Sequence, residues 1–238
     1  MTIESGALGR RIVRVDDHDS YVCRPHPPGE IAGALTGLTL ASAHRRGKTM
    51  WVETDGRPVL GLHLGMAGRI AIDEPPIERP WDRFVLDFED GGRLALRDRR
   101  RLGRAVLDPD VSRLGPDAAE VGRAAFRDRV GRGAAPLKAR IMDQEVVAGV
   151  GNLLADEALW RARLNPRRPA GAVSGEELDR LRRELRSAIR AAIRKGGVHT
   201  GDFSQERARD GRCPRCGAPL HRAVVGGRTT YWCPEEQR

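Results

Sequence analysis

The sequence is poor in cysteine and has no long apolar segment. It contains four cysteines in 238 residues, and three of them crowd the C-terminus, which is not a disulfide framework. No apolar run approaches the ~18 residues that a membrane-spanning helix needs, and the start lacks the basic-then-apolar layout of a signal peptide. These absences argue against a secreted or membrane protein and predict a reducing cytoplasm, with Cys23 as a structural thiol.

Acidic residues are outnumbered by basic ones. The chain has 42 Lys and Arg against 33 Asp and Glu, a formal net charge of +9 and an isoelectric point near 10.3. Each Lys or Arg that neutralises a phosphate releases counterions, so the excess favours a polyanionic partner. A solvated basic surface on an arginine-rich protein gives the same composition, and charge alone leaves both interpretations open.

The first part of the chain has the patterns of β-strands. In residues 82–98, Phe84, Leu86 and Phe88 occupy alternate positions and so share one face of a strand, and Asp90-Gly91-Gly92 forms a turn, which is typical of a hairpin. Further strand patterns occupy residues 10–17 and 49–65, the second of them turned at Asp55-Gly56. Several such elements predict a β-sandwich.

After residue 108 the apolar period becomes helical. Helix patterns occupy residues 119–131, 136–147, 153–162 and 175–195. In the longest, Ser174 is a suitable N-cap with Glu177 three residues on, and Gly196-Gly197 ends the helix. Residues 198–211 resemble a linker. The expected fold is α+β, with a β-sandwich (1–108), a helical domain (109–205) and a finger-like hairpin (206–238).

A glycine-rich turn separates two of the helix patterns. Gly149 and Gly151 let the backbone come close to a bound group, and amides at the head of the following helix suit a phosphate. Asn152 stands where a side-chain amide can add a hydrogen bond. Most glycine-rich helix turns are only turns, so this segment by itself leaves a structural role open.

Longer motifs are more specific. LKARIMDQEVVAGVGNLLADEALWRA (137–162) resembles the helix–two-turn–helix signature of the formamidopyrimidine-DNA glycosylase and endonuclease VIII family. Further motifs match that family in the correct order: RRGK (45–48), HLGMAGR (63–69), RDRRRLGR (97–104), LGPD (114–117) and GGRTTYWC (226–233). The resemblance covers nearly the whole chain. It implies a monomeric base-excision-repair protein on bacterial-type nucleoid DNA, with glycosylase and AP-lyase activity on duplexes that carry an oxidised base or an abasic site.

The resemblance also implies DNA-contacting residues: Lys48, Met66, Arg100, Leu102, Lys138, Asn152 and Arg228. Four of them grip phosphates around the damaged nucleotide, namely Lys48, Lys138, Asn152 and Arg228. An extruded base costs a few kcal/mol of stacking, which wedge residues partly replace.

The resemblance implies that three residues supply the wedge. Met66 would fill the void left by the flipped base, Arg100 would pair with the orphaned base, and Leu102 stands where the family has an intercalating Phe. From the residues alone, Met66 could also be core beside Leu64, and the arginine run at 99–101 could be a solvated charge run.

The start of the chain departs from the family pattern. The family's nucleophile is an N-terminal proline followed by a glutamate, both opening a helix, whereas this chain begins MTIESGALGRRIVRV. The amine of Thr2, after removal of Met1, and the carboxyl of Glu4 are the available catalytic candidates. The segment before Gly9 is expected to be too short for the helix that positions the catalytic amine. Misplacement of the amine by an ångström can lower the reaction rate ~100-fold. Two explanations stay open: a start site set too far downstream, or a shortened paralogue that binds damaged DNA without cutting it.

The cysteine spacing predicts a zinc site with an unusual fourth ligand. Cys213-x-x-Cys216 and Cys233-x-x-Glu236 keep the spacing of a four-ligand site, and three thiolates with one carboxylate can hold Zn²⁺ tetrahedrally. His221 or water are alternative fourth donors. The family also includes fingers that fold without metal, so a metal-free hairpin remains the second possibility.

Overall fold

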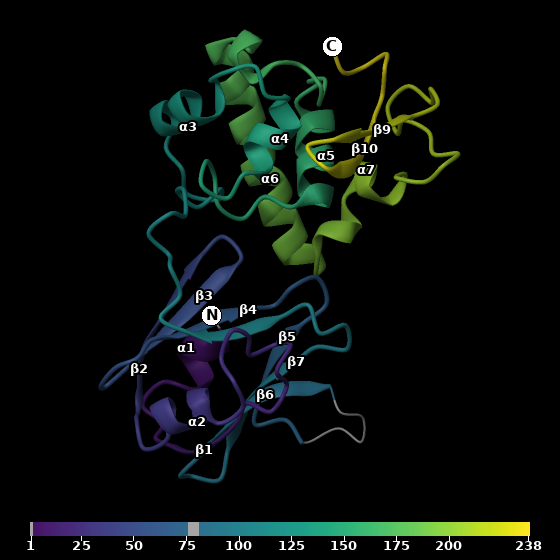
Figure 1. Ribbon diagram of the computed structural model, residues 1–238. Helices are drawn as coiled ribbons and strands as arrows, with labels where there is room; N and C mark the ends of the chain where they lie inside the picture. The colour runs from purple at the N-terminus through teal and green to yellow at the C-terminus, as the bar shows by residue number, and fades with distance from the viewer. Residues whose placement is uncertain (1, 76–80) are drawn as a thin grey trace. The chain divides into compact units, whose positions relative to one another are not determined.

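The computed structural model describes residues 2–75 and 81–238. The chain divides into two compact units, Met1–Ser112 and Arg113–Arg238 (Figure 1). Each unit has its own cluster of buried apolar side chains.

The first unit is built on two four-stranded sheets whose paired strands all run antiparallel. The strand orders are β1-β6-β7-β5 and β2-β3-β4-β8. Their bounds are β1 Ile12–Asp16, β2 Leu40–Arg46, β3 Thr49–Thr54, β4 Leu60–His63, β5 Arg69–Ile72, β6 Asp82–Phe88, β7 Arg93–Arg97 and β8 Arg104–Leu107. Side chains from both sheets share one core, which confirms the predicted β-sandwich.

The β6–β7 hairpin forms as predicted, with Leu86 opposite Leu94 in the register. Phe84, Leu86 and Phe88 are all at most 2% exposed and lie in the sandwich core. The other face of β6 is covered as well, because Val85 packs with Ala71 and Ala95 in a small separate cluster. This sheet therefore buries apolar residues on both faces, which the alternating pattern did not indicate.

Two short helices in the first unit were not predicted. Helix α1 spans Thr2–Gly6 and α2 spans Glu30–Leu35. Ile3 and Ala7 are four residues apart, so they share one helical face, and both are buried in the sandwich core. The segment before Gly9, expected to be too short for the positioning helix, thus forms a short helix of five residues, because its apolar side chains bury against the sheets.

The second unit is mainly helical. Its helices are α3 Arg123–Val130, α4 Leu137–Met142, α5 Asn152–Arg161, α6 Gly175–Lys195 and α7 Asp202–Gln205, with 3-10 turns at Ala170–Ala172 and Val198–Thr200. Strands β9 His221–Val225 and β10 Arg228–Trp232 form a separate hairpin.

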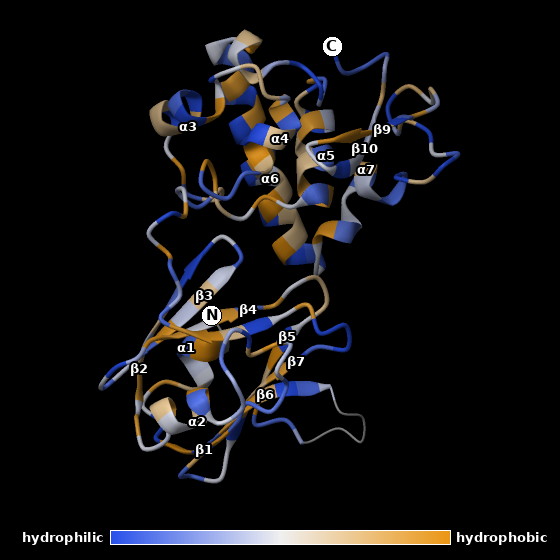
Figure 2. Cartoon of the chain, in the orientation of Figure 1, coloured by the Kyte–Doolittle hydropathy of each residue, from blue (hydrophilic) through white to orange (hydrophobic). Residues whose placement is uncertain are grey.

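Helix α6 has the predicted ends. Ser174 and Glu177 form a reciprocal capping box, and Gly196 ends the helix in the left-handed conformation at φ 80°. Its apolar residues Leu178, Leu181 and Leu185 are buried in the core of the second unit. Figure 2 shows the resulting alternation of hydrophobic and hydrophilic bands along this helix.

The segment predicted as a linker is ordered. It contains α7, whose Phe203 is fully buried and stacks on Trp160 of α5 with ring centroids 5.5 Å apart. Cys213 and Cys233 belong to the same cluster, so the hairpin region packs onto the helices of its unit. The linker prediction is wrong because one buried aromatic side chain anchors the segment. None of the helices in the described part of the chain has the length and apolarity to cross a bilayer.

Candidate DNA-binding loops and metal centre

Two loops of the first unit touch at one point. The first, residues 64–68, joins β4 to β5, and the second, residues 98–103, joins β7 to β8. Gly65 has φ +61°, and a Cβ added there would lie 2.6 Å from the carbonyl carbon of Leu102. A side chain at this position would force the loops apart, so glycine is needed for their contact.

The first loop presents Met66 to solvent. This side chain is 77% exposed, although methionine is usually buried. The amide of Gly68 donates to the carbonyl of Leu64 at 2.9 Å and closes the turn that carries it. The alternative interpretation of Met66 as a core residue is therefore wrong.

The second loop is organised by the buried carboxylate of Asp98. It accepts hydrogen bonds from the amides of Arg100 at 2.9 Å and of Leu102 and Gly103 at 2.7 Å each. Arg101, between them, has φ +56°, which the three bonds hold in place. Sequence reasoning missed Asp98, and its only signal was its place directly before the arginine run.

The three consecutive arginines are not equivalent. All three are exposed, but Arg101 forms an ion pair with Asp19, with nitrogen and oxygen 2.7 Å apart, and the guanidinium carbon of Arg99 lies 5.6 Å from the ring centroid of Trp81. Leu102 is partly buried. A uniform solvated charge run does not describe this loop, because each residue has a separate environment.

Lys48 and His63 lie at neighbouring places in the second sheet. Lys48 is exposed in the β2–β3 turn, and the next residue, Thr49, pairs with His63. The amide of Gly65 donates to Nδ1 of His63 at 2.9 Å, so Nε2 carries the proton. Burial, and then the charge of Lys48, lower the pKa of His63, which favours a neutral imidazole with one N–H donor. Sequence reasoning missed His63, although it begins the HLGMAGR motif.

The structure places Lys138 in the interior. Its side chain is fully buried, Nζ lies 2.7 Å from Oδ1 of Asp156, and it donates to Oγ1 of Thr230 at 2.7 Å. Burial lowers its pKa, while the nearby Asp156 carboxylate acts in the opposite direction. The prediction that Lys138 grips a phosphate is corrected here: α4 turns this residue toward α5, where Asp156 supplies its counter-charge.

Three donors meet at one carbonyl of the hairpin. The oxygen of Thr229 accepts from Nδ2 of Asn152 at 3.1 Å, from Nη2 of Arg207 at 3.0 Å and from Nζ of Lys138 at 3.4 Å. Asn152 and Lys138 thus act on the residue next to Arg228. The structure brings these three predicted residues together, but only the side chain of Arg228 is exposed.

Arg207, which sequence reasoning missed, is held by the same buried acid. Its Nε donates to Oδ2 of Asp156 at 2.8 Å, and that oxygen also accepts the amide of Tyr231 at 3.2 Å. One carboxylate on α5 therefore fixes β10 through a side chain and through the backbone. No local motif signalled Arg207, because its partners lie far away in the sequence.

The hairpin tip rests on α4. Gly226 and Gly227 have φ +56° and +72°, which is typical of a two-residue turn between antiparallel strands. A Cβ on Gly226 would lie 2.8 Å from the Cβ of Ala139, so only glycine allows this approach. Arg228 follows directly and is exposed.

The glycine-rich turn before α5 is fixed by one side chain. The amide of Gly149, at φ +106°, donates to Oε1 of Gln144 at 3.0 Å, and Nε2 of Gln144 donates to the carbonyl of Val150 at 3.0 Å. The first helical bond of α5 runs from Ala155 to Gly151. The amides ahead of it lie at the positive end of the helix dipole.

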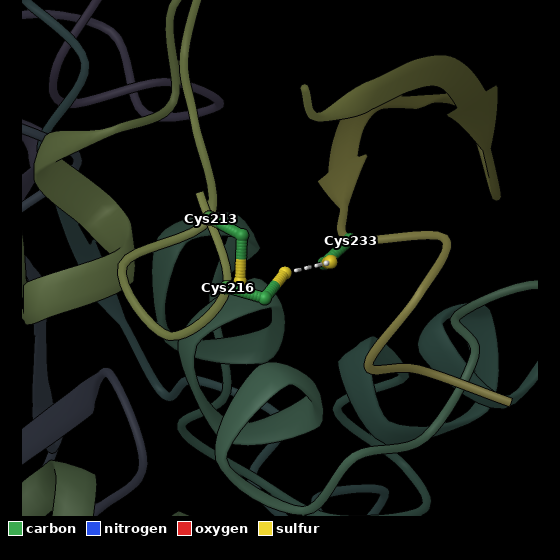
Figure 3. Close-up of side chains that lie close together, drawn as sticks. All are labelled: Cys213, Cys216 and Cys233. Atoms are coloured by element: carbon green, nitrogen blue, oxygen red, sulfur yellow. Dashed lines mark hydrogen bonds between the residues drawn. The ribbon is translucent and has the colours of Figure 1, made fainter. Parts of the chain in front are cut away.

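Three cysteines converge in the second unit. The sulfurs of Cys213, Cys216 and Cys233 lie within 4.8 Å of one another. Those of Cys216 and Cys233 are 3.5 Å apart, and the dashed line in Figure 3 marks this contact. Although burial raises it, hydrogen bonds from the indole of Trp160 and from backbone amides lower the pKa of Cys213 below its ordinary value. Three close thiols, one of them disposed to ionise, fit a zinc ion.

Glu236 does not join this group. Its Oε2 lies 3.5 Å from Nη1 of Arg163 and 3.8 Å from Nη1 of Arg215. Among the described residues the metal-ligating cluster comprises the three cysteines, without Glu236 or His221. The structure thus differs from the predicted four-ligand set, because two arginines attract the carboxylate. That oxygen is nevertheless buried without a hydrogen bond among the described atoms, which leaves it able to accept a further partner.

Gln237 supports the second knuckle. Its Oε1 accepts the amide of Cys233 at 2.9 Å, and its Nε2 donates to the carbonyl of Leu164 at 2.9 Å. The side chain is 1% exposed. Sequence reasoning missed this residue, whose only signal was its place directly after the Cys233-x-x-Glu236 spacing.

The two catalytic candidates lie on α1. Thr2 begins the helix, and its side chain is outside the described part of the chain. Glu4 is exposed. The helix packs against β5, since a Cβ on Gly6 would lie 3.2 Å from the side chain of Ile72.

Three family profiles match consecutive parts of the chain. They are the formamidopyrimidine-DNA glycosylase N-terminal domain over residues 1–105, the formamidopyrimidine-DNA glycosylase H2TH domain over 114–204, and the zinc finger found in FPG and IleRS over 211–235. The formamidopyrimidine-DNA glycosylase of Roseiflexus sp. (strain RS-1) is 37% identical, over 97% of this chain and 93% of that protein. The chain belongs to the formamidopyrimidine-DNA glycosylase family.

Solved members of the formamidopyrimidine-DNA glycosylase family have the same fold. The MutM (Fpg) protein of Thermus thermophilus is 34% identical, with a TM-score of 0.78 over 97% of this chain and 92% of that chain. The Lactococcus lactis enzyme, bound non-covalently to DNA with an AP site, is 26% identical, with a TM-score of 0.83 over 99% and 95%. The α+β architecture, the helix–two-turn–helix domain and the finger-type hairpin are confirmed as family features.

Proposed function

We propose that this chain recognises duplex DNA carrying an oxidised base or an abasic site, as a monomeric base-excision-repair protein of the glycosylase and AP-lyase type on nucleoid DNA. The observation that supports this most directly is the exposed Met66 on a loop that touches the loop of Arg100 and Leu102. An apolar wedge beside a cationic donor is what an extruded nucleotide requires on the duplex it leaves behind.

The two loops divide the work of replacing a base. Met66 enters the void in the stack, and its flexible thioether adapts to the bases on either side. Arg100 offers hydrogen bonds to the orphaned base, because Asp98 fixes its backbone and leaves its guanidinium exposed. Leu102 fills space beside that base without ring stacking. Together they offset the few kcal/mol that unstacking costs.

Phosphates are held by donors from both units. Lys48 and the Nε2–H of His63 act in the first unit, and Arg228, Asn152 and the leading amides of α5 act in the second. Lys138 serves them from the interior by fixing Thr229. These contacts position the DNA backbone and carry no base selectivity.

A zinc ion would be held by the three cysteines. We assign the fourth position to Glu236, released from its arginines, with His221 or water as alternatives. The ion would stabilise the knuckles next to the hairpin that carries Arg228. We retain residues 1–108, 109–205 and 206–238 as the functional division of the chain.

The catalytic step requires an amine. The amine of Thr2, freed by loss of Met1, would condense with C1′ of an abasic sugar, releasing water and forming an imine, and Glu4 would transfer the protons. Borohydride reduces such an imine to a stable secondary amine, so trapping on abasic-site DNA detects it. A covalent adduct supports a lyase, and binding without an adduct supports a damaged-DNA binder that does not cut.

Recognition itself is tested with three otherwise identical duplexes. One is intact, one carries a tetrahydrofuran abasic analogue and one carries an oxidised guanine. We expect at least one modified duplex to bind well above the intact one at equal salt concentration, measured by fluorescence anisotropy, with light scattering to establish the mass of the complex. Equal affinity for all three would refute the proposed function.

A further inference from the structure

Tyr21 is an exposed aromatic residue surrounded by arginines. Its side chain is 46% exposed, and the guanidinium carbon of Arg24 lies 3.9 Å from the ring centroid. The guanidinium carbons of Arg104 and Arg101 lie 5.2 and 5.6 Å from the same centroid. Guanidinium groups are attracted to aromatic faces, so the ring gathers three positive charges.

Only one of these charges has an acidic partner among the described contacts. Arg101 pairs with Asp19, which also lies 3.6 Å from Arg83. Burial opposes ionisation of Asp19, but hydrogen bonds from Arg101 and from a backbone amide lower its pKa below the ordinary value. Asp19 is therefore ionised at neutral pH and shared between two arginines.

Arg24 and Arg104 instead donate to neutral oxygens. Nη1 of Arg24 donates to the carbonyl of Tyr21 at 2.9 Å, and Nη1 of Arg104 donates to the same carbonyl at 3.2 Å. Arg104 also reaches the carbonyl of Gly103 at 2.9 Å. Two full positive charges thus meet at one oxygen, where they repel each other, while most of their N–H donors stay available.

We propose that Tyr21, Arg24 and Arg104 form an additional binding site for a backbone phosphate of DNA. A phosphate between the two guanidiniums relieves their repulsion and accepts their remaining N–H donors in the planar geometry that arginine favours. Tyr21 orients the guanidiniums through its ring and its carbonyl.

The position of this site identifies DNA as the source of the phosphate. Arg104 and Arg101 flank Leu102 and Gly103, so the site continues directly from the loop that carries the wedge. A duplex engaged by that loop brings its backbone to the same edge of the first unit. The inference rests on the proposed function and adds a contact that none of the predicted residues provides.

The test is the salt dependence of binding in the Arg24→Gln/Arg104→Gln variant. Each lost phosphate contact lowers the slope of log affinity against log salt by about 0.9 on duplex DNA. We expect a slope lower by about one unit and weaker binding to intact and abasic-site duplexes alike. Arg14→Gln is the matched control, since Arg14 is 70% exposed on β1 and paired with Asp87, and it should keep the wild-type slope.

A purely structural role gives a different result. If the arginines only tie segments 21–24 and 103–104 together, the double variant melts at a lower temperature and keeps its salt slope, which would overturn the proposal. Should the double variant not fold, the salt slope of the single variant Arg24→Gln, at an exposed position, is measured instead. A slope lower than that of the wild-type protein supports the site, and an unchanged slope overturns it. Arg104→Lys keeps the charge and should keep most of the slope.

Failure of this site is distinguishable from failure of the proposed function. The slope is measured on intact DNA, so it reports the phosphate contact regardless of damage recognition. If the wild-type protein shows no preference for modified duplexes, only the proposed function is refuted. If the double variant keeps the wild-type slope of log affinity against log salt on every duplex, only the phosphate site at Tyr21 is refuted.

Discussion

Lys138 and Asp156 form an ion pair of 2.7 Å in which neither side chain has any exposed surface. The pair joins α4 to α5, and through Thr230 and Thr229 it also holds the hairpin of β9 and β10. A charge with this degree of burial persists only with its counter-charge, so the two residues depend on each other.

Lys138→Met should therefore be strongly destabilising. Methionine keeps most of the buried volume but leaves Asp156 without the lysine charge, and breaking a buried pair typically costs about 3–5 kcal/mol. We expect a loss of that order in the free energy of unfolding, measured by urea denaturation. Arg140→Met, in the same helix at a partly exposed position, is the control and should cost much less. A loss below about 1 kcal/mol for Lys138→Met would contradict the structure.

Arg207→Ala should weaken DNA binding through Arg228. Arg207 links Asp156 to the carbonyl of Thr229, so its removal loosens the backbone that directs the neighbouring Arg228 outward. Arg228→Ala alone should weaken binding to every duplex and lower the salt slope by about one unit. The effects of the two substitutions should be less than additive, because they act on one contact.

A double-mutant cycle measured by anisotropy gives the coupling between these arginines. Arg209→Ala is the matched control, since Arg209 is exposed two residues away and its substitution removes the same charge. Full additivity of Arg207→Ala and Arg228→Ala, or an equal effect of Arg209→Ala, would show that Arg207 contributes only charge.

Local signals in the sequence predicted local structure well. The capping box of Ser174 and Glu177 and the turn at Asp90-Gly91-Gly92 depend on neighbours within a few residues, and both formed as expected. The exposed Met66 also matches the expectation from its motif. For the capping box and the turn the physics is contained in the segment itself, whereas the expectation for Met66 came from the family resemblance.

Partners from distant segments could not be predicted in this way. A lysine in a phosphate-binding motif is equally compatible with exposure and burial, and the decision at Lys138 came from Asp156 on the facing helix. The spacing of Glu236 suits a metal ligand, but Arg163 and Arg215 compete for its carboxylate. In both places the charge meets a counter-charge that the fold supplies from a distant segment.

His63 should make stability depend on pH. Burial and Lys48 hold its pKa below the ordinary value of 6.5. Between that lowered pKa and 6.5 the unfolded chain binds more protons than the folded protein, so stability should fall as pH drops through this window. His63→Asn keeps an acceptor for the amide of Gly65 but does not titrate. Urea unfolding from about pH 7.5 to about pH 5 should therefore show a smaller decline for the variant; identical declines would exclude this origin.

Zinc affinity should increase in Glu236→Cys. A fourth thiolate is a softer donor than a carboxylate and suits a zinc site of three cysteines, and the substitution removes the carboxylate whose Oε2 lies 3.5 Å from Arg163 and 3.8 Å from Arg215. Competition with a chromophoric chelator should show tighter zinc binding by Glu236→Cys than by the wild-type protein, at one zinc per chain. Cys213→Ser in the otherwise wild-type chain should lose zinc binding, because two cysteines of the cluster remain, Cys216 and Cys233.

Glu236→Gln separates the two possible roles of the native carboxylate. If Glu236 supplies the fourth ligand, the neutral amide binds zinc much more weakly than the wild-type protein, and the cobalt-substituted protein changes its visible spectrum. If the carboxylate stays with its arginines, zinc affinity and the cobalt spectrum are preserved. The substitution then lowers only the free energy of unfolding of the metal-free chain. The preserved spectrum would refute ligation by Glu236, since exchanging a carboxylate ligand for an amide alters the ligand field of cobalt whatever the stability of the fold.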